Sequence, residues 1–216
     1  MRIGILGAAG IATGLGGAMV RAGHEVFIGA RNPGSAKEAA ATAGAAGHGT
    51  LDGAAAHGDA VLAALPAGAA PAVAELLAGA LAGRTLIDCT NDLTFGADGP
   101  VFADEGAPPV ARRIADAAPD AHVVKAFNLC HESVWSSAAP ESDGRPLGVP
   151  LCGDDSGAVA RTAGLITSLG CTPLRLGGLS RAAYLEATAA FAIGAAAAGA
   201  EPRLAFALPM VGPAPA

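Results

Sequence analysis

The sequence predicts an α/β fold: a mostly parallel sheet wound by helices on both sides, followed by a small C-terminal helical extension. Three observations predict it. Short apolar runs alternate along the chain with longer segments that have helical spacing. The 216 residues are 52% hydrophobic, which suits one large domain with a sizeable core. Gly and Pro residues punctuate the runs, and no linker typical of independent domains separates them.

The N-terminal segment predicts a strand, a turn, a helix and a second strand. Residues 2–6 form a short apolar run, of the kind that a strand buried on both faces needs. Gly7–Gly10 interrupts this run, and residues 11–21 then have helical spacing. Gly23 ends the helix, and residues 24–28 form the next strand. This order is that of the first βαβ unit of a dinucleotide-binding, Rossmann-type fold.

The same signals predict the remaining elements. Further strands are expected at residues 48–51, 59–65, 85–90, 122–127, 147–152 and 171–176. Further helices are expected at residues 33–43, from 52 onward, and at 70–81, 110–117, 155–169 and 179–199. Two stretches rich in Gly, Pro and polar residues, 91–109 and 128–145, are predicted to be long loops.

Composition and charge exclude several classes of function. The net charge is −6 without a basic run, which argues against nucleic acid as a partner. The four cysteines lie far apart, so neither a metal site nor a disulfide framework is expected. Met1 leads directly into a strand, and the apolar segment 187–200 is shorter than the ~20 residues of a membrane span. We therefore expect a cytoplasmic protein that has no membrane contact.

Ligands of an open parallel sheet bind at the carboxyl ends of its strands, where the strand order reverses. The predicted elements place five segments there: Gly7–Ile11, Gly29–Asn32, Leu65–Pro66, Cys89–Asp92 and Phe127–His131. Function is expected on these loops.

The first of these loops departs from the usual phosphate-binding pattern. The spacing GxGxxG falls on Gly7, Ala9 and Ala12. The Cβ of Ala9 would crowd a phosphate, although Gly10, one residue later, could allow the loop to shift. Two interpretations remain open: a serviceable phosphate site, or a Rossmann-like sheet that has lost the nucleotide.

The second loop indicates which dinucleotide would bind. A strand that ends in Asp or Glu binds the ribose diol of NAD, whereas this one ends in Gly29-Ala30-Arg31-Asn32. The guanidinium of Arg31 can pair with a 2′-phosphate, which favours NADP(H) over NAD(H). The alternative is that Arg31 is a solvated surface side chain.

The chain resembles the NADP oxidoreductases that use the deazaflavin coenzyme F420, and the related N-terminal domains of pyrroline-carboxylate reductases. The resemblance covers nearly the whole chain. It is carried by Gly23–Val26 (GHEV), Gly29–Arg31, Leu65-Pro66, Ile87–Asn91 (IDCTN), Val123–Asn128 (VVKAFN), Val149–Asp155 (VPLCGDD) and Gly177–Glu186 (GGLSRAAYLE). VPLCGDD and KAFN are the most specific of these segments.

The resemblance implies hydride transfer between NADP(H) and coenzyme F420 as a second substrate. It implies an NADP-binding Rossmann domain at residues 1–153, with a sheet that can extend to about residue 176, and a smaller helical part at 154–216. The cofactor-binding residues that it implies are Gly7, Ala8, Ala9, Gly10, Ile11, Ala30, Arg31, Asn32, Ser35, Leu65, Pro66, Asn91, Asn128 and Cys130. Two features depart from the family: Ala9 and Gly10 in the turn, and polar and bulky groups in residues 129–135.

Two other functions stay open. Hydride transfer between two rings needs positioning and exclusion of water, but little from side chains. A reductase of a small carbonyl, alkene or imine would instead need a proton donor, and His131 is the best candidate, with Cys130 or Glu132 nearby. His131 could equally be a hydrogen-bonded loop residue. The third possibility is a non-redox protein whose nucleotide binding is weakened at Ala9.

Three further expectations concern packing. The helix 179–199 has small residues on most faces, and the tail 204–211 is apolar, so a homodimer through this region is expected. Trp135, the single tryptophan, is expected in the core or at an interface rather than as a stacking platform for a ligand. Asp155 is expected to cap the helix that follows it.

Overall fold

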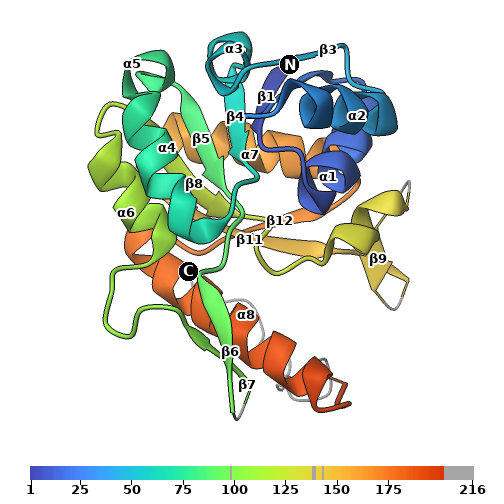
Figure 1. Cartoon of the computed structure of the whole chain (residues 1–216). Coiled ribbons are helices and arrows are strands. Elements are labelled where there is room, and N and C mark those ends of the chain that lie inside the picture. Colours follow the sequence, from blue (N-terminus) through green and yellow to red (C-terminus); the bar gives the residue numbers. More distant parts are fainter. Residues whose placement is uncertain (98, 138–139, 143, 202–216) are drawn as a thin grey trace, which may run out of the picture.

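One eight-stranded sheet runs through the computed structural model, which describes residues 1–97, 99–137, 140–142 and 144–201 (Figure 1). Its strand order is β12-β11-β8-β5-β4-β1-β2-β3. The strands are β1 (Arg2–Leu6), β2 (Glu25–Gly29), β3 (Gly47–Gly49), β4 (Ala60–Ala63), β5 (Thr85–Asp88), β8 (His122–Ala126), β11 (Gly148–Gly153) and β12 (Thr172–Arg175). The chain runs outward in one direction through β1, β2 and β3, and in the other from β4 onward. This reversal confirms the Rossmann-type topology.

Helices cover both faces of the sheet, which confirms that it is doubly wound. One face carries α1 (Gly10–Arg21), α2 (Pro33–Ala43) and α7 (Ser156–Ser168). The other carries α3 (Leu51–His57), α4 (Ala70–Leu76), α5 (Ala78–Leu81) and α6 (Val110–Ala117). Alternate strand residues face opposite layers: Ile3 and Ile5 lie in the first core and Leu6 in the second. Because both faces are buried, the strands read as continuous apolar runs.

One strand pair departs from the parallel arrangement. β11 pairs antiparallel with β8, with Leu151 opposite Ala126 and Gly153 opposite Val124. A parallel connection needs a crossover, usually an α-helix. In the described part of the segment between β8 and β11, the regular elements are the 3-10 helix η2 (Glu132–Ser136) and a two-stranded hairpin, β9 (Glu141–Ser142) with β10 (Arg145–Pro146). The chain therefore returns on the neighbouring strand in the opposite direction.

Both segments predicted as loops contain regular structure, so that prediction is wrong. Residues 128–145 hold η2 and the β9–β10 hairpin, and residues 91–109 hold a hairpin of β6 (Leu93–Gly96) and β7 (Gly99–Phe102). Strands this short, with mixed polarity and Gly at their ends, give no clear alternation in sequence. The hairpin β6–β7 is stabilised by packing of β7 on helix α8 (Ala182–Ala197).

Smaller differences lie at helix ends. The predicted helix 70–81 is preceded by the 3-10 helix η1 (Ala67–Ala69) and interrupted at Leu77, whose φ of −100° and ψ of 8° leave the helical range. Helix α8 begins after the 3-10 helix η3 (Leu179–Arg181). Gly10 is the first residue of α1 and no longer part of the turn. Asp155 caps α7 as predicted, because its carboxylate accepts the Ala158 N–H at 2.7 Å.

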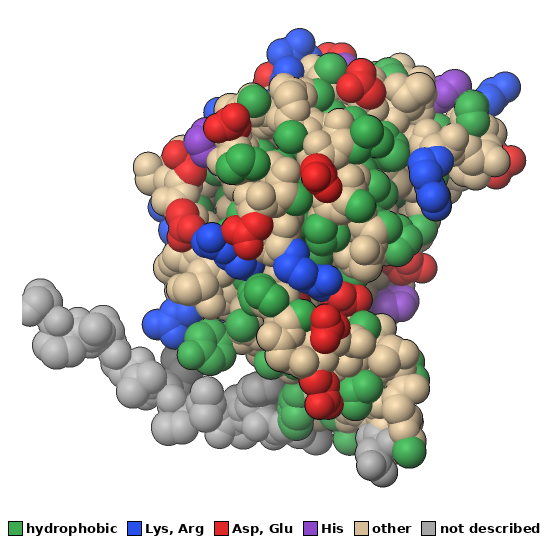
Figure 2. All heavy atoms as spheres, turned by 60° about the vertical axis from the view of Figure 1, so that its left-hand side comes forward, with side chains coloured by type: hydrophobic (Ala, Val, Ile, Leu, Met, Phe, Trp, Pro, Cys, Tyr) green, Lys and Arg blue, Asp and Glu red, His purple; other side chains and the backbone are tan. Residues whose placement is uncertain are grey.

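Helix α8 and the β6–β7 hairpin project together from the body of the protein (Figure 1). Large apolar side chains are exposed on this projection: Phe95 at 69%, Tyr184 at 64% and Phe191 at 50%. Acidic and basic side chains are interspersed on the face seen in Figure 2. The predicted apolar tail 204–211 lies outside the described residues. Among the helices of the described ranges, none combines the length and apolar character that a bilayer span requires.

Candidate functional site

Two cavities lie at the carboxyl edge of the sheet, around the point where the strand order reverses between β1 and β4. The first, here called the Arg31 cavity, has a volume of about 580 Å³. The second, the Asn128 cavity, has a volume of about 610 Å³. Leu65, two residues after the end of β4, lines both cavities. The two cavities therefore adjoin at the place where this fold binds ligands.

The turn between β1 and α1 forms one wall of the Arg31 cavity. Gly7 has φ +116°, and a Cβ there would lie 2.0 Å from the carbonyl oxygen of Ala64, so only glycine fits. Ala9 has φ −86° and ψ −176°, an extended conformation that any residue adopts. Alanine therefore causes no backbone strain at this position.

The N-terminus of α1 is left without a side-chain cap, because the N-cap residue Ala9 has only a methyl group. By contrast, Asn32 caps α2 and accepts the N–H groups of Gly34 and Ser35 at 2.8 and 3.2 Å. Uncapped N–H groups at a helix start, together with the helix dipole, favour an anion. The β1–α1 turn thus keeps the electrostatic property of a phosphate site despite its altered sequence.

Arg31 is the single charged residue among those that line the first cavity. Its side chain is exposed, and within the described part of the chain no hydrogen bond or ion pair engages the guanidinium. The other lining residues are Gly7, Ala8, Ala9, Ala30, Asn32, Pro33, Ser35, Leu51, Ala64, Leu65, Pro66, Ala69 and Val73. The cavity thus combines the guanidinium of Arg31, which has no partner among the described residues, with a mainly apolar lining. Eight of the predicted binding residues lie with Arg31 here: Gly7, Ala8, Ala9, Ala30, Asn32, Ser35, Leu65 and Pro66.

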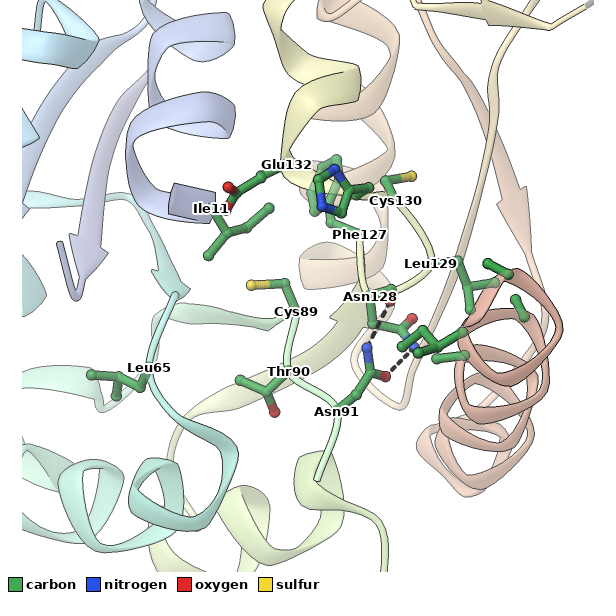
Figure 3. A pocket seen from close by; sticks show the side chains of 15 residues that line it. Ile11, Leu65, Cys89, Thr90, Asn91, Phe127, Asn128, Leu129, Cys130 and Glu132 are labelled. Carbon is green, nitrogen blue, oxygen red and sulfur yellow. Dashed lines mark hydrogen bonds between the residues drawn. The ribbon is translucent and has the colours of Figure 1, made fainter. Parts of the chain in front are cut away.

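The Asn128 cavity lies between the loops that follow β5 and β8, the start of α1 and helix α8 (Figure 3). It is lined by Ile11, Leu65, Cys89, Thr90, Asn91, Phe127, Asn128, Leu129, Cys130, His131, Glu132, Ala189, Ala192, Ile193 and Ala196. The predicted residues Ile11, Asn91, Asn128, Cys130 and His131 all lie here. Gly10, predicted to bind with them, lines neither cavity but stands between them at the start of α1.

Asn91 and Asn128 hold two loops of the second cavity together. The Asn91 amide donates to the Asn128 carbonyl at 2.8 Å, and the Asn128 amide donates to Asn91 Oδ1 at 2.9 Å (Figure 3). Asn128 Nδ2 also donates to the carbonyl of Leu185 on α8, at 3.1 Å. Phe127 precedes this pair with φ +66°, a conformation that is rare for a bulky residue. This sharp turn ends β8 and carries Asn128 into the cavity.

A buried ion network lies beneath the same loops. The ammonium of Lys125 donates to Asp88 Oδ2 at 2.8 Å, to Glu186 Oε1 at 2.7 Å and to the Thr90 carbonyl at 2.5 Å. All three charged side chains are at most 3% exposed. Burial lowers the pKa of Lys125, but attraction and hydrogen bonds from Asp88 and Glu186 outweigh burial and leave that pKa raised.

The network links segments that are far apart in the sequence. Asp88 ends β5, Lys125 lies in β8, and Glu186 lies on α8, where its carboxylate also accepts the N–H of Val110 at the start of α6. The three charges come from the IDCTN, VVKAFN and GGLSRAAYLE segments. These segments therefore meet in one place, where they fix α8 against the sheet as a wall of the cavity.

His131 lies at the cavity and also caps η2. Its Nδ1 accepts the N–H of Ser133 at 3.3 Å and lies 2.9 Å from Ser133 Oγ. Because Nδ1 accepts, the proton of the neutral ring is assigned to Nε2. His131 is therefore a hydrogen-bonded loop residue through Nδ1, as one of the two interpretations expected. Its Nε2 has no hydrogen bond among the described residues and could donate to a ligand. A role in catalysis remains a prediction.

Two cysteines of the Asn128 cavity have weakly acidic thiols, and the tryptophan lies in the core. Burial raises the pKa of the Cys89 and Cys130 thiols to about 12, so neither is a nucleophile near neutral pH. Trp135 is fully buried and packs its ring edgewise on Phe127, with centroids 5.5 Å apart. This confirms the expected core position.

Among the described residues, no cluster of His, Cys, Asp and Glu has the arrangement of a metal site.

Sequence reasoning missed the wall that α8 supplies. Ala189, Ala192, Ile193 and Ala196 follow the spacing i, i+3, i+4 and i+7, so they lie on one helix face. That spacing is visible in the sequence, but nothing in it says which face of an alanine-rich helix meets a cavity. Leu51, Ala69 and Val73 of the first cavity were missed for a similar reason, since they look like ordinary core residues.

Comparison with known proteins agrees with this geometry. Residues 2–92 match the family described as NADP oxidoreductase coenzyme F420-dependent. A solved structure from Arthrobacter sp. FB24, provisionally described as an F420-dependent NADP reductase, is 26% identical. It has a TM-score of 0.78 and covers 92% of this chain and 95% of its own. A hypothetical protein from Sinorhizobium meliloti is 27% identical with a TM-score of 0.72, covering 83% of this chain and 86% of its own.

A curated relative is larger. The rat metalloreductase STEAP3 is 29% identical over 188 residues, which are 86% of this chain but 36% of that protein. The chain therefore spans about a third of the length of this relative. The N-terminal residues 2–92 thus match the family of coenzyme F420-dependent NADP oxidoreductases, and the chain as a whole shares the Rossmann-like fold of the Arthrobacter structure.

Proposed function

We propose that the protein transfers a hydride between NADP(H) and a second planar ring compound, the deazaflavin coenzyme F420. The observation that supports this is the pair of adjoining cavities at the reversal of strand order. The Arg31 cavity offers a cation that has no partner among the described residues, and the Asn128 cavity offers a mainly apolar space. A dinucleotide that spans both cavities would place its two halves in different environments.

The residues of the Arg31 cavity fit the phosphate-bearing half of NADP. Arg31 can grip a 2′-phosphate through its guanidinium, and no carboxylate lines the cavity to hold an unmodified ribose diol. Leu51 and Val73 offer an apolar surface for a flat base. The uncapped start of α1 suits the diphosphate. Asn32 contributes indirectly, because its side chain is engaged in capping α2.

In the Asn128 cavity the protein's contribution is positioning. NADPH, when bound, supplies the hydride. Transfer between two rings requires the reacting carbons to be held about 3–3.5 Å apart with water excluded. Leu65, Phe127 and the alanines of α8 exclude water, and the Asn91–Asn128 pair fixes the loops on one side. The small side chains of α8 leave a wall on which a flat ring can lie.

Titration of the purified protein with NADPH and NADH, followed by calorimetry, tests this function. Removing a charge-assisted contact costs about 1.5–3 kcal/mol, so Arg31→Ala should weaken NADPH binding by about 10- to 150-fold. Affinity for NADH should stay nearly unchanged, because it lacks the 2′-phosphate. Loss of the visible absorbance of coenzyme F420 on adding NADPH tests the acceptor. No change anywhere between about pH 5 and 9, which spans the titration of histidine, would contradict F420 as the acceptor.

Reduction of a small carbonyl, alkene or imine is a second candidate, supported by the available Nε2 of His131 at the cavity. Such a reaction needs a proton donor, whereas transfer between two rings does not. His131→Ala should then lower turnover of the small substrate at least a hundredfold, within the range for a general acid. Unchanged turnover would remove His131 as the donor.

We further propose that the protein is a homodimer that pairs through the projection of α8 and the β6–β7 hairpin. Phe95, Tyr184 and Phe191 expose apolar surface there. Sedimentation at micromolar concentration should give twice the 20.7 kDa mass of the chain. A monomeric mass would refute this assembly.

A further inference from the structure

Glu132 packs against the first turn of α1, at the place where the two cavities meet. A Cβ added to Gly10 would lie 1.7 Å from Glu132 Oε2, so the carboxylate fills the space that this glycine leaves open. A Cβ on Gly14 would lie 2.9 Å from the carbonyl oxygen of Glu132. Figure 3 shows the carboxylate beside Ile11, at the start of the helix. Two glycines one turn apart therefore let η2 approach α1 closely.

This carboxylate has no structural partner. Among the described residues, neither a hydrogen bond nor an ion pair engages it, although it is exposed and points at the uncapped helix start. Three helices, α2, α3 and α7, are capped by the side chain of their own N-cap residue (Asn32, Thr50 and Asp155), whereas α1, like α4, α6 and α8, has no such cap. At α1 a distant acidic side chain stands where a helix favours an anion.

The position matters because of what the cavities would hold. Gly7, Ala8 and Ala9 line the Arg31 cavity, while Ile11 and Glu132 line the Asn128 cavity. A dinucleotide that spans both, as the proposed function requires, must pass the first turn of α1 with its diphosphate. Its negative charges and that of Glu132 then compete for the same helix start.

We propose that Glu132 sets the affinity for the dinucleotide by opposing its diphosphate, and that the side chain moves aside when the dinucleotide binds. The inference rests on the proposed function. Among the described residues, the exposed side chain has no hydrogen bond or ion pair, so it can leave the space beside Gly10 without breaking one. A dinucleotide that acts as a substrate must leave after each turnover, and this charge favours its release. Glu132 thus lowers the affinity for the dinucleotide and speeds its release after turnover.

The magnitude follows from Coulomb's law. A negative charge beside a diphosphate weakens binding by Coulomb repulsion, which grows as the separation and the local dielectric constant fall. Salt and solvent reduce this, so we expect Glu132→Gln to lower the Kd for NADPH about tenfold. The glutamine keeps the shape of the side chain and removes its charge.

Calorimetry of the full chain at low salt tests the proposal with two ligands and one control variant. Adenosine 2′-phosphate carries the Arg31-binding group but no diphosphate, so its Kd should be the same for wild type and Glu132→Gln. Glu141→Gln removes an equal charge from β9, which lines neither cavity, and should leave both affinities unchanged. The gain in NADPH affinity should shrink when salt is raised to about 1 M.

Each contrary result has a distinct meaning. Equal NADPH affinity for wild type and Glu132→Gln would overturn the role of Glu132 and leave the proposed function intact. Weaker NADPH binding by the variant would show that Glu132 holds the ligand, and would also overturn the proposal. An equal fall in the Kd for adenosine 2′-phosphate would show that Glu132 repels any anionic ligand, and would overturn a specific effect on the diphosphate. If neither protein binds NADPH, the proposed function itself fails.

Discussion

Replacing Lys125 by Met tests whether the buried ion network holds α8 and the cavity loops in place. The substitution keeps an unbranched side chain of similar length but removes the cation. Asp88 and Glu186 are then left buried without it, and the Thr90 carbonyl loses its donor. Removing one partner of a buried ion pair destabilises by about 3–5 kcal/mol, because an uncompensated charge stays buried. A domain of this kind has about 5–15 kcal/mol of stability in total, so the loss is large.

Two comparison variants give the expected order. Glu186→Gln leaves Lys125 paired with Asp88 and keeps an oxygen that can accept the Val110 N–H, so about 1–2 kcal/mol should be lost. Arg112→Gln removes a pair with Asp116 whose side chains are 56% and 55% exposed, and such surface pairs contribute about 0–1 kcal/mol. The free energy of unfolding should therefore fall most for Lys125→Met and least for Arg112→Gln.

Urea unfolding followed by tryptophan fluorescence measures these values. Trp135 is the single tryptophan and is fully buried, so its emission reports the core directly. Since the folded pKa of Lys125 is raised above its ordinary 10.5, the stabilisation that comes from protonation of Lys125 is fully present below pH 10.5. This contribution is lost as the pH rises through the folded pKa. A Lys125→Met loss below about 1 kcal/mol at neutral pH would refute the reasoning.

Two further predictions concern the turn and the thiols. Gly7→Ala should destabilise by more than about 3 kcal/mol in urea unfolding, because strain at φ +116° adds to the clash with Ala64. Gly23→Ala, at φ +83° with no atom within 4 Å of the new methyl, should cost only about 1–2 kcal/mol, and equal losses would contradict the clash. Cys89 and Cys130, whose pKa burial raises to about 12, should resist iodoacetamide at pH 8 in the native protein and react in urea. Native alkylation as fast as in urea, measured by mass spectrometry, would show that these thiols are not protected.

Most strands of the sheet, and the loops at their carboxyl ends, could be predicted from the pattern of apolar residues along the chain. Buried parallel strands are continuous apolar runs, so β1, β2, β4, β5 and β8 were visible, and so were the loops at their carboxyl ends. The missing carboxylate after β2 and the presence of Arg31 indicated the kind of dinucleotide. The division of the chain at residue 153 and the cytoplasmic location stay predictions.

The role of Gly10 shows where local pattern misleads. In sequence it looks like a displaced glycine of the phosphate turn. In the structure it opens α1 and makes room for Glu132, a residue 122 positions away. The sequence around Gly10 or Glu132 does not indicate this contact, because it depends on how η2 packs against α1.

The sequence alone indicated the main strands and helices of the sheet and the loops at their carboxyl ends, and it predicted a preference for a 2′-phosphate at Arg31. These follow from hydrophobic periodicity and turn chemistry, which are local. Only the tertiary structure decided that Asp88, Lys125 and Glu186 meet, that one face of α8 closes the second cavity, and that Glu132 faces the start of α1. These are contacts between distant segments, fixed by the packing of helices on the sheet rather than by any neighbouring residue.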